Sequence, residues 1–131
     1  MSLKVGNKIF ISWDEIDQLV EELCHKIRIS GSKPKSVTGI ERGGLIPAVM
    51  VSHKLNIPYV TRINKDTLVV DDICDTGKTL ANITLGYSAT LHYKKTAEYV
   101  PDFSAKEVGE EWIVYPWENK DSEEIQDYLK R

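Results

Sequence analysis

The sequence predicts a single-domain α/β fold, in which helices flank a mainly parallel sheet. The first observation is length, because 131 residues fit one domain and can bury a core. The second is the alternation of strand-like and helix-like segments from Ser36 to Tyr93, which is typical of a parallel sheet. The third is Leu68–Val70, a wholly apolar run that suits a central strand covered on both faces.

An edge strand at Lys8–Ile11 and a long helix are the first elements expected. Ser12 and Glu15 form a capping-box pattern, in which each side chain satisfies a free backbone N–H, so the helix begins there. Apolar residues then recur at helical spacing, which predicts one face packed inward: Ile16, Leu19, Val20, Leu23 and Ile27. The helix is expected to end at Ser30-Gly31-Ser32, a turn signal that Pro34 follows.

Strands and helices alternate through the middle of the chain. The expected strands are Ser36–Ile40, Tyr59–Arg62, Leu68–Val70 and Ala89–Tyr93. A helix is expected over Leu45–Leu55, and its buried positions include Leu45, Val49, Val51 and Leu55. A loop at Asp75–Lys78 opens another helix that runs to about Leu85, where Gly86 would cap it.

The remainder of the chain shows weaker patterns. Residues 94–118 are less regular than the middle, and Asp121–Arg131 resembles a short polar helix with Asp121 or Ser122 as its cap. No internal repeat or low-complexity stretch divides the chain.

Composition excludes several classes of function. The formal net charge of −3 argues against a nucleic-acid binder, and no apolar run reaches the length of a membrane span. Cys24 and Cys74 form no CxxC pair, so a reducing, cytoplasmic location is expected. The three histidines (His25, His53 and His92) lack metal-ligand spacing and are expected to be surface or packing residues.

Two loops follow expected strands and are candidates for a binding site. Ligands of open parallel sheets bind outside the carboxyl ends of the strands, which here carry Glu41–Gly44 and Asp71–Thr79. The later part of the second loop, Thr76-Gly77-Lys78-Thr79, opens a helix, so its backbone N–H groups favour a phosphate. Gly77 permits close approach of the backbone, and the two threonine hydroxyls add donors. Lys78 either adds charge or lies in solvent.

The acidic residues of the second loop distinguish between two possible kinds of phosphate-binding site. A nucleotide-binding P-loop needs a glycine five residues before Gly77, where this chain has Asp72, and a carboxylate there would repel phosphates. Asp71 and Asp72 suit a different ligand, because adjacent carboxylates can accept hydrogen bonds from two ribose hydroxyls or hold Mg²⁺. A phosphate cradle beside such a pair describes a ribose 5-phosphate site. The structural alternative is a polar turn that caps a helix.

Val69–Leu80 resembles the signature of the type I phosphoribosyltransferases, which bind phosphoribosyl pyrophosphate. Ile9–Asp14, Gly39–Pro47 and Trp112–Glu118 are similar to segments of the xanthine-guanine branch, in the same order. The resemblance covers most of the chain to Glu118. It implies that residues 1–131 form one phosphoribosyltransferase domain, with a core at about 36–93. A small irregular hood for the base would come from about 94–118, together with residues 1–11.

The resemblance also implies the roles of individual residues. The pyrophosphate loop would be Glu41, Arg42, Gly43 and Gly44, in which the peptide before Arg42 is often cis in the family. The phosphate and ribose would be held by Asp71, Asp72, Asp75, Thr76, Gly77, Lys78 and Thr79, with Asp71 and Asp72 also associated with Mg²⁺. Asp75 would be the catalytic residue, bonded to purine N7. Its structural alternative is a helix N-cap.

The base-binding residues implied by the resemblance lie in the last third of the chain. Lys94 matches the lysine that contacts the purine 6-oxo group, although the adjacent Lys95 leaves the register open by one residue. Trp112 would stack on the base, and its structural alternative is core packing. Ile113 and Glu118 match residues near the 2-substituent, which favours guanine or xanthine over adenine. Arg42 also has a structural alternative, a surface arginine at a tight turn.

The implied activity is that of a purine phosphoribosyltransferase. It would transfer ribose 5-phosphate from phosphoribosyl pyrophosphate to a 6-oxopurine (guanine, xanthine or hypoxanthine), forming a nucleoside monophosphate and pyrophosphate, with Mg²⁺. Such enzymes usually form homodimers or homotetramers.

This chain departs from the family in one loop. Family members carry a long flexible lid before the strand that matches Leu68–Val70, and here only Ile63–Thr67 remains. Two other functions therefore stay open. One is a regulatory module that binds phosphoribosyl pyrophosphate or a nucleotide without efficient catalysis. The other is a transferase or hydrolase that acts on a different base.

Overall fold

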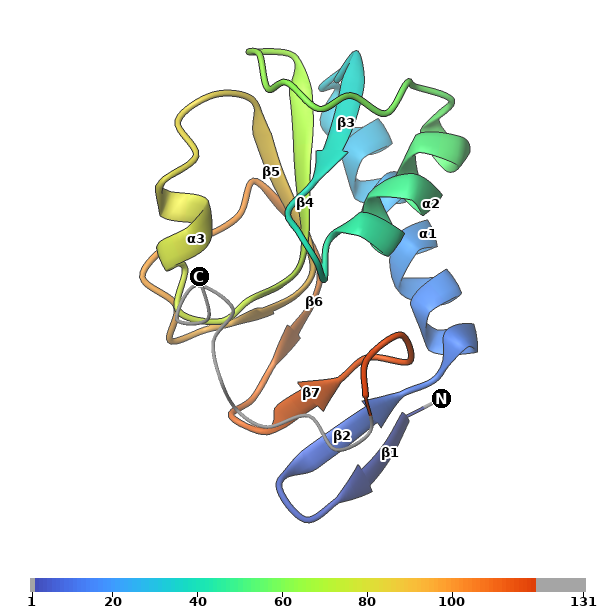
Figure 1. Cartoon of the computed structure of the whole chain (residues 1–131), viewed down its shortest axis with the longest axis vertical. Helices are drawn as coiled ribbons and strands as arrows, with labels where there is room; N and C mark the ends of the chain where they lie inside the picture. Colours follow the sequence, from blue (N-terminus) through green and yellow to red (C-terminus); the bar gives the residue numbers. More distant parts are fainter. Residues whose placement is uncertain (1, 120–131) are drawn as a thin grey trace.

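The computed structural model describes residues 2–119 and contains two sheets (Figure 1). The main sheet is four-stranded and entirely parallel, with the order β3-β4-β5-β6. Its strands are β3 (Ser36–Gly39), β4 (Thr67–Cys74), β5 (Tyr87–Lys94) and β6 (Phe103–Val108). The small sheet has the order β1-β2-β7, from β1 (Ser2–Val5), β2 (Lys8–Ile11) and β7 (Trp112–Val114). The α/β class with a mainly parallel sheet flanked by helices is thus confirmed.

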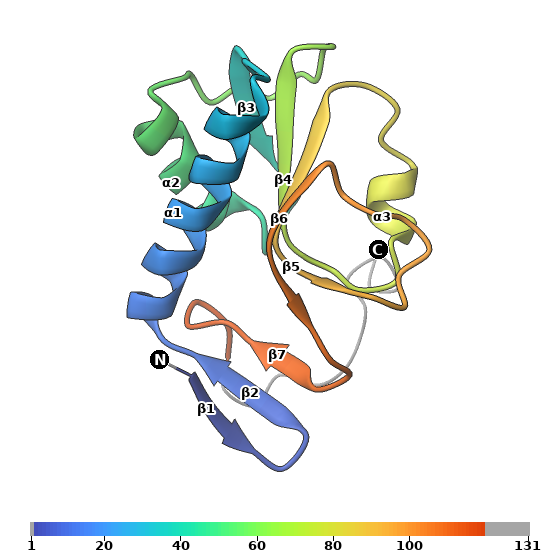
Figure 2. The same ribbon diagram turned by 180° about the vertical axis from the view of Figure 1, so that it is seen from behind.

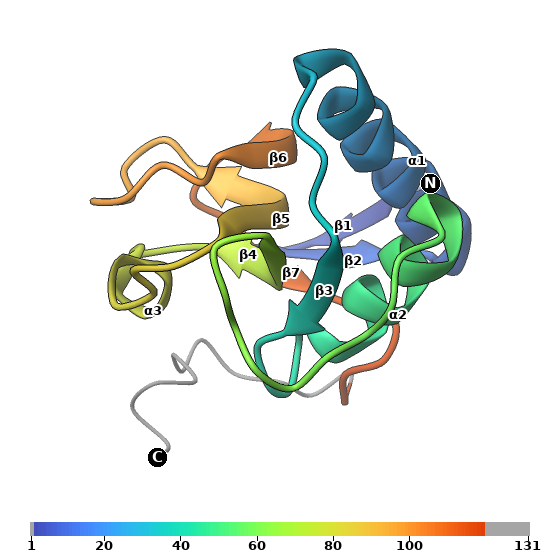
Figure 3. The same cartoon turned by 90° about the horizontal axis from the view of Figure 1, so that it is seen from above.

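Three helices cover the two faces of the main sheet. α1 (Trp13–Ser30) and α2 (Leu45–Leu55) pack on one face, and α3 (Lys78–Ala81) lies on the other. Figure 3 shows this layering from above, and Figure 2 shows α1 running upward from the small sheet alongside the main sheet. The small sheet lies beyond the carboxyl ends of the main strands. Among the described residues, no helix combines the length and apolarity needed to cross a membrane.

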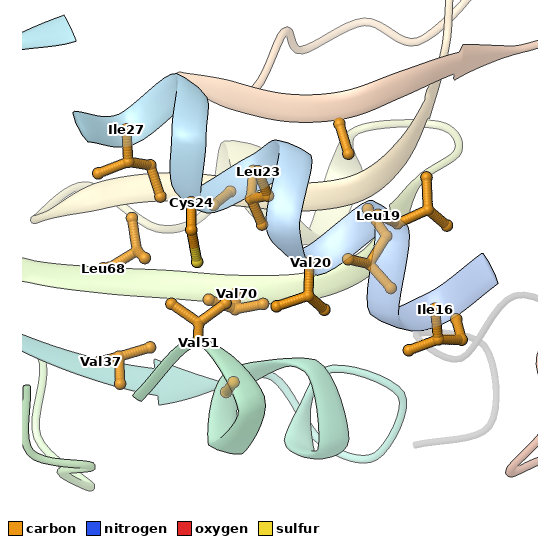
Figure 4. Packing of buried hydrophobic residues seen from close by; sticks show 14 of the residues in the cluster. Ile16, Leu19, Val20, Leu23, Cys24, Ile27, Val37, Val51, Leu68 and Val70 are labelled. Atoms are coloured by element: carbon orange, nitrogen blue, oxygen red, sulfur yellow. The ribbon is translucent and has the colours of Figure 1, made fainter. Parts of the chain in front are cut away.

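The long helix α1 begins and ends where the sequence predicts. The Ser12 side chain accepts a hydrogen bond from the backbone N–H of Glu15 at 3.2 Å, which caps the helix. Gly31 ends it in the left-handed conformation with a φ of 84°, which glycine adopts without steric cost. All five predicted core positions are buried, together with Cys24. They pack against β4 and α2, with Leu68, Val70 and Val51 as neighbours in the core (Figure 4).

Several predictions of local structure are wrong. Tyr59–Arg62 is not a strand, because this segment forms a single bridge with Val37 and then turns out into solvent. α3 ends at Ala81 instead of Leu85, since the β-branched Ile83 and Thr84 are poor helix formers. Gly86 is therefore no helix cap. It precedes β5 with a φ of 83°, and a Cβ there would lie 2.3 Å from the Thr67 carbonyl oxygen.

Other corrections concern the ends of the chain and α2. β2 is the middle strand of its sheet, since β1 pairs with it on one side and β7 on the other. β6 and β7 fall in the stretch expected to be irregular. On α2, Val49 is exposed, while Pro47, Ala48 and Val51 are its buried residues. The polar helix predicted at Asp121–Arg131 lies outside the described residues.

Candidate active site

Most of the predicted site residues gather at the carboxyl ends of β3, β4 and β5. The loop Glu41–Gly44 follows β3, and the longer loop starts within β4 and continues into α3. Lys94 is the last residue of β5, one position inside the strand where the sequence had placed it just after. Because all these strands are parallel, their carboxyl ends meet at one edge of the sheet, facing the small sheet (Figure 1).

The loop Glu41–Gly44 packs directly on Asp72, which with Asp71 forms the acidic pair of the site. A Cβ added to Gly43 would lie 2.1 Å from Asp72 Oδ2, so only glycine lets this carboxylate lie against the loop. A Cβ on Gly44 would lie 2.3 Å from the Val70 carbonyl oxygen, which accepts a hydrogen bond from Ile40 N at 2.8 Å. The peptide between Glu41 and Arg42 is cis, as the resemblance implies. Both side chains of that peptide are exposed.

Asp71 and Asp72 are oriented by the backbone that follows each of them. Asp71 Oδ1 accepts a hydrogen bond from Asp72 N at 2.8 Å, and Asp72 Oδ1 accepts one from Ile73 N at 2.7 Å. Asp72 is buried, with 8% of its surface exposed, whereas Asp71 is half-buried. The two carboxylates therefore have defined directions before any ligand binds.

The loop Thr76–Thr79 is held from behind by Glu98 and Tyr99. Gly77 has a φ of 87°, and a Cβ there would lie 2.6 Å from Tyr99 N. Glu98 N donates to the Thr76 carbonyl at 2.8 Å. The Thr76 hydroxyl accepts a hydrogen bond from Lys78 N at 3.2 Å, and the Lys78 side chain is exposed. α3 has only one turn, so its helix dipole is small. Backbone N–H groups for a phosphate would therefore be oriented by the fixed loop that precedes the helix.

Cys74 lies inside this loop but is not poised as a nucleophile. Its thiol donates to the Tyr99 carbonyl at 3.2 Å. Burial, with smaller contributions from the nearby carboxylates of Asp71 and Asp75, raises the pKa of Cys74 to about 11. A thiol with such a pKa remains protonated near neutrality, and the thiolate is the reactive form.

Asp75 and Lys94 form an ion pair at the mouth of the site. Lys94 Nζ lies 3.2 Å from Asp75 Oδ1, and the two side chains are only 9% and 14% exposed. Asp75 directly follows β4 and Lys94 ends β5, and these adjacent parallel strands pair up to Cys74 and Tyr93. The structure therefore brings together the two residues that the resemblance assigns to one edge of the purine. Lys95, the alternative in the register, is exposed.

The remaining predicted residues belong to the small sheet and the turn after it. Trp112 is half-buried, and its backbone N–H donates to the Asn7 carbonyl at 2.8 Å. The Ile113 side chain is buried in the core opposite Ile9. Glu118 Oε1 accepts a hydrogen bond from Tyr115 N at 2.8 Å, so this carboxylate also stabilises the turn in which it lies.

The sequence does not reveal two buried polar residues that are linked to the site, Tyr115 directly and His92 through Tyr115. Tyr115 Oη donates to the Asp72 carbonyl at 3.1 Å, and it lies 2.8 Å from His92 Nδ1. Burial lowers the pKa of His92 to about 4, with a smaller effect from Lys106. Burial raises the pKa of Tyr115 well above 10, and the Asp72 carboxylate adds to this. The expectation that His92 is a packing residue is confirmed, but its partner could not be inferred.

Comparisons with known proteins agree with this geometry. A scan against protein-family models finds no match. The xanthine-guanine phosphoribosyltransferase of Cereibacter sphaeroides is 30% identical over 144 aligned residues, which cover 82% of this chain and 85% of that protein. The crystal structure of a purine phosphoribosyltransferase from Pyrococcus horikoshii matches with a TM-score of 0.76 and 31% identity, over 92% of this chain and 100% of the other.

A third match was solved with a nucleotide. A hypothetical protein from Neisseria gonorrhoeae with bound ppGpp has a TM-score of 0.70 and 26% identity, over 91% of this chain and 93% of that one. The fold, the order of the loops and these relatives agree on one family and one kind of enzyme. The chain belongs to the xanthine-guanine phosphoribosyltransferase family of purine-specific type I phosphoribosyltransferases.

Proposed function

We propose that this chain transfers ribose 5-phosphate to a 6-oxopurine, with Asp75 and Lys94 holding the base and the two loops holding phosphoribosyl pyrophosphate. The observation that carries this assignment is the largely buried Asp75–Lys94 pair, whose charged atoms lie 3.2 Å apart. Such a pair presents a fixed cation beside a fixed carboxylate at the edge where ligands of parallel sheets bind.

The pair matches one edge of a 6-oxopurine. Its 6-oxygen is an acceptor for the Lys94 ammonium, and the neighbouring N7–H is a donor to the Asp75 carboxylate. Adenine would instead place its 6-amino donor against Lys94, which has no acceptor. A site built to hydrogen-bond one pattern discriminates strongly against the other. Guanine, xanthine and hypoxanthine share this edge, so the pair would select 6-oxopurines as a class without distinguishing among these three bases.

The sugar and phosphates would lie between the two loops. Thr76, Gly77 and Thr79 would hold the 5-phosphate, and Asp71 and Asp72 the ribose hydroxyls. Arg42 is exposed at the rim, where its guanidinium would pair with the pyrophosphate. Attack of a purine nitrogen at the anomeric carbon forms the C–N bond as the C–O bond to pyrophosphate breaks. Positive charge grows on the ribose, so Asp71 and Asp72 would stabilise it electrostatically.

The acidic pair also fits Mg²⁺. This ion prefers oxygen ligands and is commonly bound through one or two carboxylates plus substrate phosphates. Asp71 and Asp72 provide two such carboxylates, and no cluster of three or more His, Cys, Asp or Glu side chains suited to a metal occurs among residues 2–119. This donor set matches an ion that arrives with its substrate. Bound there, Mg²⁺ would neutralise charge on the pyrophosphate leaving group.

The short turn before β4 supports a second candidate function. Thr67 N donates to the Asn64 carbonyl at 3.1 Å, and Asn64 N donates to Thr67 Oγ1 at 3.0 Å, so the turn closes on itself. It cannot extend over the site as a long lid would. A module that binds a nucleotide without turnover is therefore the alternative, and the Neisseria relative with bound ppGpp makes that nucleotide the ligand to test. A homo-oligomer, in which a neighbour covers the site, is our proposal for an active enzyme.

The first experiment is a transferase assay with Mg²⁺, phosphoribosyl pyrophosphate and each of guanine, xanthine, hypoxanthine and adenine. We expect one or more 6-oxopurine nucleotides, stoichiometric pyrophosphate, and no product from adenine. Asp75→Asn should abolish the reaction, whereas Glu98→Gln, which changes an exposed acid, should not. Sedimentation of the active sample would measure the oligomeric state. No turnover, together with ppGpp binding by calorimetry, would leave the regulatory module as the function.

A further inference from the structure

A buried chain of hydrogen bonds links β5 to the acidic pair through the turn after β7. His92 Nδ1 lies 2.8 Å from Tyr115 Oη, and Tyr115 Oη lies 3.1 Å from the Asp72 carbonyl oxygen. His92 is 1% exposed and Tyr115 is 2% exposed, so water does not compete for these groups. The three residues come from three different segments of the chain, and none of the proposed substrate contacts uses His92 or Tyr115.

The directions of these hydrogen bonds follow from the available donors. A tyrosine has one O–H, and here it donates to the Asp72 carbonyl, which is only an acceptor. The phenol oxygen must therefore accept the second hydrogen bond, so His92 donates from Nδ1. His92 thus fixes the orientation of the Tyr115 hydroxyl, and the hydroxyl fixes the Asp72 carbonyl.

The carbonyl of Asp72 belongs to the peptide that orients the Asp72 carboxylate. The N–H of the same peptide, on Ile73, donates to Asp72 Oδ1 at 2.7 Å. The peptide is planar, so a rotation that moves its carbonyl oxygen also moves its N–H. Holding the oxygen at Tyr115 therefore holds the carboxylate, which lies against Gly43 on its other side.

Tyr115 is itself held by the turn in which it lies. Its ring stacks on Trp117 with a centroid separation of 4.9 Å and an interplanar angle of 3°. Its backbone N–H donates to Glu118 Oε1, and the Glu118 N–H donates to the Tyr115 carbonyl at 2.9 Å. The turn directly follows β7, which carries Trp112 and Ile113. A displacement of this turn would consequently be transmitted to Asp72.

We infer that Tyr115, oriented by His92, is a positioning residue that sets the direction of the Asp72 carboxylate and so couples the base-binding turn to the affinity for phosphoribosyl pyrophosphate. The inference rests on the proposed function only in naming that ligand. Tyr115 would not touch the substrate, and its effect would pass through the Asp72 peptide.

The test compares Tyr115→Phe, which keeps the stacked ring, with His92→Phe and His92→Asn. We expect Tyr115→Phe to raise both the Kd and the KM for phosphoribosyl pyrophosphate about tenfold, because it leaves the buried Asp72 carbonyl without its donor. The KM for the purine should change less than about twofold, well below that loss. His92→Phe should show a smaller rise, and His92→Asn, which can place an N–H near Nδ1, should recover part of it. Thr90→Val is the matched control.

Thr90 suits this control because it lies on the same strand as His92, is fully buried, and has no hydrogen-bond partner for its Oγ1 among the described residues. Removing such a hydroxyl should leave both constants at the wild-type value. Circular dichroism at the assay temperature would establish that each variant is folded, and calorimetry with Mg²⁺ present measures binding independently of turnover.

The outcomes separate this inference from the proposed function. Wild-type protein that binds phosphoribosyl pyrophosphate without forming nucleotide would end the transferase assignment, while a weaker Kd in folded Tyr115→Phe would still support the positioning role. An unchanged Kd and KM in folded Tyr115→Phe would overturn it, as would an equal rise in the KM for the purine. Wild-type protein that binds no phosphoribosyl pyrophosphate would overturn both.

Discussion

Lys94 and Lys95 are adjacent in the sequence but lie in different surroundings. Lys94 is buried against Asp75 at the end of β5, and Lys95 points into solvent. Their contrast offers a matched pair of variants for the base-binding assignment. It also tests whether the register taken from the family resemblance is correct.

Lys94→Gln is expected to raise the KM for guanine about 10- to 100-fold, because it removes a charged hydrogen bond to the 6-oxygen. The KM for phosphoribosyl pyrophosphate should change much less. Steady-state kinetics with each substrate varied in turn would measure both. Lys95→Gln should behave as wild type, and a defect found in that variant alone would mean that the register is shifted by one residue.

Gly43 is the second residue whose role can be tested singly. Gly43→Ala would place a Cβ 2.1 Å from Asp72 Oδ2, so either the loop or the carboxylate must move. We expect the free energy of unfolding to fall by about 1–3 kcal/mol, the usual cost of overpacking, and the affinity for phosphoribosyl pyrophosphate to fall with it. Urea unfolding and calorimetry would measure the two effects.

Gly109→Ala serves as the control for that substitution. Its Cβ would meet only the end of the Glu111 side chain, at 2.9 Å, and that side chain can move. Its stability should therefore stay within about 0.5 kcal/mol of wild type. If Gly43→Ala proved as stable and bound as tightly, Asp72 would not be confined by the loop as the geometry indicates.

At the scale of elements, α1 provides much of the packing on one face of the main sheet. It lies against β5 and β6, and its apolar face is buried along its whole length. The helix begins at a serine cap, so the local contribution of that cap can be separated from the packing. The cap satisfies the backbone N–H of Glu15 in the first turn through the side chain of Ser12, a residue that the sequence pattern marks.

Ser12→Ala should lower the free energy of unfolding by about 1 kcal/mol, because the N–H of Glu15 loses its acceptor. Ser12→Asp should retain the wild-type stability, since aspartate is an equally good N-cap and adds negative charge at the helix N-terminus. Urea unfolding at neutral pH would compare the three proteins. Equal losses in both variants would show that the hydroxyl packs rather than caps.

At the scale of the whole molecule, the buried His92 couples folding to pH. Burial lowers its pKa from 6.5 to about 4, with a smaller effect from the Lys106 charge. Between these values the unfolded chain binds a proton that the folded chain does not, so stability falls as the pH drops from 6.5 toward 4. Above pH 6.5 this contribution is complete.

The contribution can be isolated with His92→Phe, which does not titrate. Between pH 7 and pH 4.5 the wild type should lose about 2–3 kcal/mol more than this variant, because only the wild type must bury an uncharged imidazole. Urea unfolding across that range would measure the free energy of unfolding of both proteins. The carboxylates are common to both, so their contribution cancels when the two values are subtracted. Parallel pH profiles would contradict the assigned shift.

Local patterns determined much of the fold from the sequence alone. The cap at Ser12 and the helical spacing after it defined α1, because capping and amphipathicity act within a few residues. The apolar run Leu68–Val70 located the central strand for the same reason. The positions of the loops at the strand ends, and hence of Asp71, Asp72 and Thr76–Thr79, followed from the order of these elements.

The tertiary structure decided what depends on neighbours. Residues 103–108 form β6 by pairing with the edge of β5. The sequence does not predict this strand, because the adjacent exposed residues Lys106 and Glu107 interrupt the alternation of apolar and polar residues. Thr76 and Gly77 are supported by Glu98 and Tyr99, which no local pattern marks. The contacts of Tyr115 with His92 and Asp72 join residues separated by 23 and 43 positions. Hydrogen bonds over such separations depend on how the chain folds back on itself, and therefore they were settled only by the packed structure.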